Sequence, residues 1–104
     1  MSSPRASHAA VDPVVSAARE EITALDVQLV ATINKRLATV QALRAYKAEH
    51  GIAFLDPGRE AWLVAHLQEH NEGPLSDEAV AELCAFVLDL VKRELAAAGS
   101  TEAR

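Results

Sequence analysis

The sequence is poor in aromatic residues and contains a single cysteine. Of its 104 residues, 4% are aromatic and 50% are hydrophobic, chiefly alanine, leucine and valine. Such a composition suits the packing of helices against one another. Cys84 has no second cysteine with which to form an internal disulfide, so we expect a protein of the reducing cytoplasm.

Long apolar runs are also missing. No stretch is long enough to span a bilayer, and the N-terminus lacks the apolar core of a signal peptide, so we expect neither a membrane partner nor secretion. The formal net charge of −5 argues against nucleic acid as the main partner. A small anionic ligand is still compatible with this charge, because its binding depends on local clusters of cations.

Three helices are predicted, and no segment has the alternation of a strand. The first spans about residues 14–50, with no internal proline or glycine, and Gly51 ends it. The second spans about residues 57–70 with Asp56 as its N-cap, and Ser76 caps the third. The apolar residues that recur at helical spacing and should be buried are Ile22, Leu25, Leu29, Ile33, Val40 and Leu43, then Leu63 and Leu67, then Val80, Leu83, Cys84, Val87, Leu90, Val91 and Leu95.

The two ends of the chain lack this periodicity. Residues 1–14 mix proline, serine, alanine and histidine, and we predict a disordered arm there. The chain should lose order again after Leu95, which leaves residues 99–104 as a frayed tail. The predicted folded domain is therefore 15–98.

The length of the first helix predicts the oligomeric state. A helix of about 36 residues is roughly 54 Å long, whereas a compact domain of this size has a radius of gyration of about 13 Å. One chain alone would leave much of the apolar stripe in water. We therefore predict an all-α fold of three helices per chain, one very long, in an intertwined homodimer.

Five charged side chains lie where these helices should bury apolar surface, namely Arg19, Arg36, Lys47, Arg59 and Glu60. Buried cations are costly unless an anion meets them, so the pattern indicates a pocket for a small, multiply anionic ligand. Arg36 and Lys47 share one helix face and lie about 16 Å apart along the axis. Arg19 is about 25 Å from Arg36, so it would complete the pocket of a partner chain.

Several polar residues also have simpler interpretations. Asp56 could serve only as a helix cap, and Arg44 lies off the stripe, as expected of a surface residue. His66 and His70 have helical i, i+4 spacing, but without a third ligand we predict no metal. Cys84 should be an ordinary core residue.

At the charged positions the chain resembles the all-helical chorismate mutases. The matching segments are Arg19-Glu20-Glu21-Ile22, Leu25-Asp26, Lys35-Arg36, Tyr46-Lys47 and Asp56-Pro57-Gly58-Arg59-Glu60. Their order and separations match as well as their residue types, over roughly residues 15–95.

This resemblance implies an intertwined dimer that rearranges chorismate to prephenate, at the branch leading to phenylalanine and tyrosine. Arg19 of the partner chain and Arg36 would bind the two substrate carboxylates. Lys47 would donate to the ether oxygen, with Arg59 supporting the site and Asp56 and Glu60 at the ring hydroxyl. No cofactor or metal is implied.

The sequence departs from the family pattern on the third helix. The family places Gln or Glu there as a second donor to the ether oxygen, whereas this chain has Leu95, with Glu94 one residue earlier and Val91 one turn earlier. Glu94 is the candidate donor, although its neighbours Lys92 and Arg93 also suit a solvated helix end.

Three alternatives therefore stay open. The first is a related enzyme, an aminodeoxychorismate mutase or an isochorismate pyruvate-lyase. The second is a weakly active subunit that needs a shikimate-pathway synthase as partner. The third is a helical dimerisation module that binds no ligand.

Overall fold

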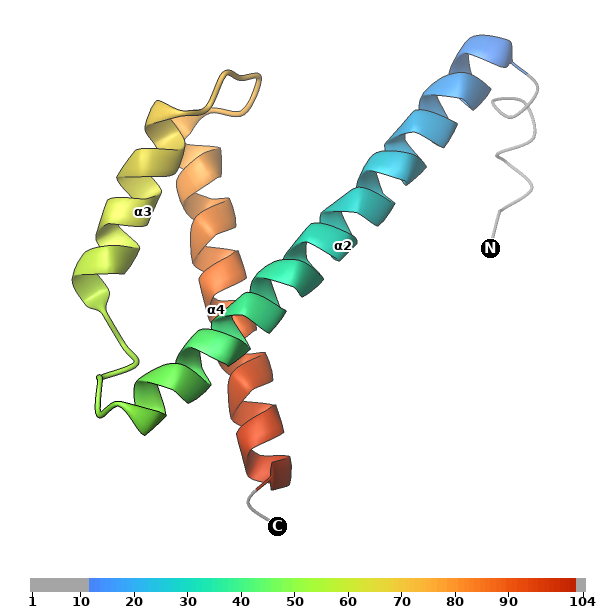
Figure 1. The fold of residues 1–104 in the computed structure, drawn as a ribbon. Helices are drawn as coiled ribbons and strands as arrows, with labels where there is room; N and C mark the ends of the chain where they lie inside the picture. The colour runs from blue at the N-terminus through green and yellow to red at the C-terminus, as the bar shows by residue number, and fades with distance from the viewer. Residues whose placement is uncertain (1–11, 103–104) are drawn as a thin grey trace. The chain divides into compact units, whose positions relative to one another are not determined.

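The fold in this computed structural model consists of three helices (Figure 1). The structure describes residues 12–102, with side chains through residue 98. Helix α2 spans Pro13–Glu49, α3 spans Pro57–Glu69 and α4 spans Asp77–Glu102, and no strand occurs within the described range. The predicted all-α class and the one very long helix are confirmed.

By its internal contacts the chain divides into two units, and the boundary falls inside α2. The first unit ends at Arg36 and the second begins at Leu37. The second unit therefore contains the last part of α2 together with α3 and α4, and α3 packs against α4.

Local sequence signals explain where each helix begins and ends. The Asp56 carboxylate accepts a hydrogen bond from the Arg59 backbone N–H at 3.0 Å, with Pro57 at the first helical position. The Ser76 hydroxyl accepts from the Ala79 N–H at 3.1 Å. Gly51, at φ 66°, ends α2 as predicted, because a left-handed residue there costs glycine little.

The start of α2 uses a signal that the sequence analysis overlooked. The Asp12 carboxylate accepts from the backbone N–H groups of Val14 at 2.8 Å and Val15 at 3.2 Å. Pro13 follows this cap just as Pro57 follows Asp56. Helix α2 therefore begins inside the segment 1–14 that was predicted as an arm, and residues 1–11 of that segment lie outside the described range.

The C-terminal end differs from the prediction. Helix α4 continues to Glu102, beyond Leu95 and into the expected tail. Residues 96–98 are three consecutive alanines, which are the strongest helix formers, and this explains the longer helix. The extent of the folded domain otherwise stays a prediction.

The core of the second unit lies on one stripe of α4. Val80, Cys84, Val91 and Leu95 are buried, each with 7% or less of its surface exposed, and Cys84 is a free thiol as expected. Other residues predicted to be inward are exposed in the single chain, including Leu67 at 40% and Leu83 at 49%. Periodicity identified an apolar face, but α3 and α4 cover only part of it.

The apolar stripe of α2 is also largely exposed. In the first unit Ile22, Leu25 and Leu29 are each more than half exposed. None of the described helices has the length and apolar composition of a membrane span. Covering of this stripe by a second chain stays a prediction at this point.

Candidate active site

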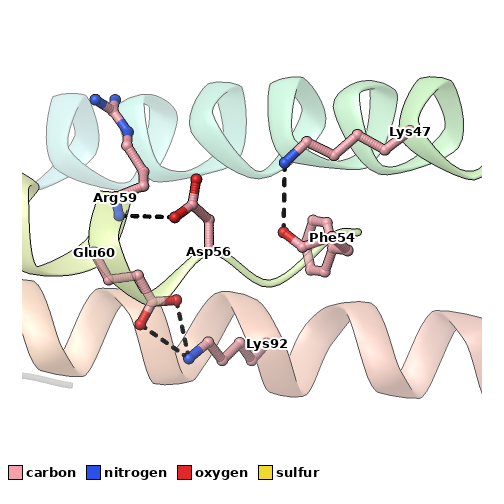
Figure 2. Close-up of polar contacts among 6 residues, drawn as sticks. All are labelled: Lys47, Phe54, Asp56, Arg59, Glu60 and Lys92. Carbon is pink, nitrogen blue, oxygen red and sulfur yellow. Dashed lines mark hydrogen bonds and ion pairs between the residues drawn. The ribbon is translucent and has the colours of Figure 1, made fainter. Parts of the chain in front are cut away.

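Six residues of the second unit, from α2, the following loop, α3 and α4, make the three sets of polar contacts drawn in Figure 2. Lys47 comes from the last turn of α2 and Phe54 from the loop. Asp56, Arg59 and Glu60 come from the start of α3, and Lys92 comes from α4. Four of these six, namely Lys47, Asp56, Arg59 and Glu60, are residues that the sequence singled out.

Lys47 is half-buried, and its ammonium group has hydrogen-bond donors that are not engaged by a strong contact. Its Nζ donates to the Phe54 carbonyl oxygen at 3.5 Å and lies 6.0 Å from the centroid of the Phe54 ring. A hydrogen bond of this length is weak, and an ammonium group has three donors. Lys47 can therefore turn a donor towards a ligand without losing a strong internal contact.

Asp56 caps α3, and this use of its side chain is confirmed. One carboxylate oxygen, Oδ1, accepts from the Arg59 N–H, while the Asp56 carbonyl accepts from the Glu60 N–H at 3.2 Å. The cap fixes the Asp56 side chain at the start of the helix. The cap engages only Oδ1, so Oδ2 can accept a hydrogen bond from a ligand.

Glu60 has a partner that the sequence analysis missed. Lys92 Nζ lies 3.1 Å from Glu60 Oε2 and 3.3 Å from Oε1, so one ammonium meets both carboxylate oxygens (Figure 2). Lys92 had been interpreted only as part of a solvated helix end. The burial of Val91 was expected from its spacing, but the way α3 packs against α4 was not, and this packing is what brings Lys92 to Glu60.

The side chain of Arg59 extends along α3. Its guanidinium carbon lies 4.5 Å from the centroid of the Trp62 ring, and the residue is exposed. Such stacking is a favourable cation–π geometry. In the single chain, Arg59 thus contributes its backbone N–H to the Asp56 cap and its charge to Trp62.

Arg19 and Arg36 belong to the first unit and differ in environment. Arg19 is exposed, whereas Arg36 is half-buried. The Nη1 atom of Arg36 is withdrawn from solvent and has no hydrogen-bond partner among the described residues. A buried donor without an acceptor is costly, so this nitrogen is suited to meet an anion.

The second donor predicted on α4 has no clear counterpart among the described α4 side chains. Val91 and Leu95 are buried at 5% and 4% exposure, and Glu94 is exposed. Arg44, predicted as a plain surface residue, donates from Nη1 to the Leu95 carbonyl at 3.1 Å and lies 5.9 Å from the Phe54 ring. That surface prediction was therefore incomplete, because Arg44 links α2 to α4.

A third potential metal ligand accompanies the two histidines of α3. The donor atoms of His66, Glu69 and His70 all lie within 4.8 Å of one another, so Glu69 is a potential third ligand that the spacing of the two histidines did not indicate. Ring contacts already account for the position of the two histidines, since the Trp62 ring stacks on His66 with centroids 4.3 Å apart and the His66 and His70 centroids lie 4.2 Å apart. His70 Nδ1 also lies 2.9 Å from the His66 carbonyl oxygen.

Together these features describe an all-helical arrangement over residues 12–102, with cations and carboxylates at the end of α2, at the start of α3 and on α4. A sequence profile of the chorismate mutase type II family matches residues 18–94, and the chain belongs to this family. The matched range includes every predicted site residue, from Arg19 to Glu94.

Individual relatives agree with this assignment. A chorismate mutase structure from Thermus thermophilus aligns with a TM-score of 0.72 and 26% identity, over 74% of this chain and 96% of that chain. Bifunctional chorismate mutase/prephenate dehydratases from Stutzerimonas stutzeri and Pseudomonas aeruginosa are 36% and 34% identical over 75 and 74 residues, 66% of this chain. The chain spans 20% of the length of these two relatives.

Proposed function

We propose that this chain is a cytoplasmic chorismate mutase that rearranges chorismate to prephenate in phenylalanine and tyrosine biosynthesis. The observation that carries the proposal is the family match over residues 18–94, which contains the whole predicted site. The similarity to the Thermus chorismate mutase over nearly all of that chain supports it further.

The reaction fits a site made only of charged and polar side chains. In a unimolecular rearrangement one C–O bond breaks as one C–C bond forms, so no nucleophile is needed. The protein has to hold a compact substrate conformer and stabilise the charge that develops on the ether oxygen. Preorganised cations and carboxylates can do both.

We assign each residue a role by its position and free hydrogen-bonding capacity. Arg36, with its unpartnered Nη1, binds a substrate carboxylate, and Lys47 turns a donor to the ether oxygen. Asp56 and Glu60 accept from the ring hydroxyl. The second carboxylate is bound by Arg19 of a partner chain.

The proposal includes an intertwined homodimer. The exposed stripe of Ile22, Leu25 and Leu29 supports it, because apolar patches of this kind mark protein–protein contacts. In this arrangement each site combines Arg19 of one chain with Arg36 and Lys47 of the other.

Mixing of inactive variants tests both the activity and the shared site. Arg19→Ala and Lys47→Ala chains are each expected to be nearly inactive towards chorismate. After unfolding and refolding together, half of the dimers are mixed, and each of these has one intact site. Activity should therefore return to about a quarter of the wild-type value.

A matched pair of variants serves as the control. Arg36→Ala mixed with Lys47→Ala should recover nothing, because both residues belong to the same chain of each site. If the first mixture also recovers nothing while the wild-type dimer is active, Arg19 does not act across the interface. If the wild-type chain leaves chorismate unchanged, the proposed activity itself is wrong.

A second candidate function rests on the apolar side chains of α4. Val91 and Leu95 are buried where the family pattern has polar residues, so α4 lacks one expected donor. A weakly active subunit that a shikimate-pathway synthase activates would fit this loss. Turnover of chorismate, and of its amino and iso analogues, with and without such a synthase separates the candidates.

A further inference from the structure

The ion pair between Glu60 and Lys92 joins two helices across 32 positions of the sequence (Figure 2). Both carboxylate oxygens of Glu60 lie within 3.3 Å of the ammonium nitrogen, and the side chains of Glu60 and Lys92 are 34% and 45% exposed. The other described ion pair, Arg93 with Asp89, is local to α4, with side chains 60% and 67% exposed. The Glu60–Lys92 pair is thus the more enclosed of the two.

The packing of α4 determines the position of Lys92. Val91 and Leu95 are buried, which fixes the rotation of this helix about its axis. Lys92 then lies at the edge of the contact between α3 and α4. It is level with the first turn of α3, which contains Glu60.

We propose that Lys92 is a positioning residue of the same site, which orients the Glu60 carboxylate towards the ring hydroxyl of the substrate. This inference rests on the proposed function. A carboxylate offers about four lone-pair positions, so the ammonium leaves Glu60 able to accept from a hydroxyl. Lys92 supplies the positive charge from α4, where Val91 and Leu95 supply no polar group.

The pair also affects which substrates the site accepts. A ring hydroxyl is neutral and needs only a free acceptor, whereas a protonated amine at that position would be repelled by the nearby ammonium. Lys92 should therefore favour the hydroxyl-bearing substrate over its amino analogue. A side chain with only a structural role would not change this preference.

The test compares three single variants by steady-state kinetics with chorismate. Lys92→Met removes the charge but keeps the stem, and kcat/KM should fall on the order of tenfold, because a small misplacement of a site group is costly. Lys92→Arg should restore most of the activity. Arg93→Met, the matched control from the exposed pair, should leave kcat/KM and Tm unchanged.

Two further measurements distinguish positioning from stabilisation. Lys92→Met should raise the relative kcat/KM for the amino analogue while leaving Tm close to that of the wild type, since exposed ion pairs stabilise little. The double variant Glu60→Gln with Lys92→Met should be no worse than Glu60→Gln alone, because the two residues act as a unit.

Unchanged kinetics in Lys92→Met, together with a clear loss in Glu60→Gln, would overturn the role of Lys92 and leave the proposed function standing. Absence of turnover by the wild-type chain would overturn both. Additive losses in the double variant would also refute the proposed positioning, because they would mean that Lys92 acts independently of Glu60.

Discussion

Replacement of Lys47 by methionine should separate catalysis from stability. Lys47→Met keeps the aliphatic stem but removes the ammonium group. The only described contact of that group with an acceptor is the 3.5 Å one to the Phe54 carbonyl, so the loss of unfolding free energy should be below about 1 kcal/mol. A preorganised donor at a developing negative charge contributes about 3–4 kcal/mol, so kcat should fall about 100- to 1000-fold.

The assay follows the disappearance of chorismate and identifies the product, while urea unfolding at a fixed protein concentration reports stability. Arg44→Met is the matched control, since Arg44 lies one turn earlier and is also close to the Phe54 ring. It loses the 3.1 Å hydrogen bond to Leu95 and about 1 kcal/mol of stability, but should keep kcat within about twofold of the wild type.

Three outcomes would refute this reasoning. A Lys47→Met chain with wild-type kcat would exclude Lys47 as the donor to the ether oxygen. If Arg44→Met lowers kcat as much as Lys47→Met does, the effect comes from loosening the end of α2 from the loop and α4 and not from loss of a donor. An increase in KM alone would assign Lys47 to ground-state binding.

One further variant and two matched pairs of variants test the fold and the assembly. Ser76→Ala removes the cap of α4 far from the site residues, so urea unfolding should show a loss of about 1 kcal/mol with kcat unchanged; equal stability would contradict the cap. Leu95→Ala should cost about 2–5 kcal/mol, and a similar cost for Leu83→Ala would mean that a second chain buries Leu83. Leu25→Glu should yield inactive monomers in sedimentation measurements, whereas Val27→Glu, on the opposite face of α2, should stay dimeric. If the two variants behave alike, the dimer interface is not confined to one face of α2.

Helix ends were the part of the fold that could be predicted best, because they depend on local chemistry. Three such signals were identified from sequence, and each acts within four residues. Two are N-caps, Asp56 with Pro57 and Ser76, which accept a hydrogen bond from a backbone N–H of the first turn. The third is Gly51, which ends α2. Asp12 with Pro13 has the same chemistry and was missed, because it lies in a segment interpreted as disordered.

Contacts between helices could not be predicted in the same way. Periodicity assigned Leu83 and Leu95 to one apolar face, but only Leu95 is covered within the chain, because burial depends on where the neighbouring helix lies. For the same reason the sequence singled out Glu60 without its partner Lys92. A cross-helix pair follows from the rotation of both helices, which the spacing along one helix does not determine.

The unpartnered nitrogen of Arg36 has a consequence for discrimination among metabolites. A guanidinium nitrogen that lacks an acceptor can be satisfied by the carboxylate of any small acid, so in its proposed role Arg36 contributes affinity without distinguishing one acid from another. Common organic acids should therefore act as weak competitors. Under the roles proposed above, recognition of the correct molecule has to come from the acceptors at the start of α3, Asp56 and Glu60, which require a suitably placed hydroxyl.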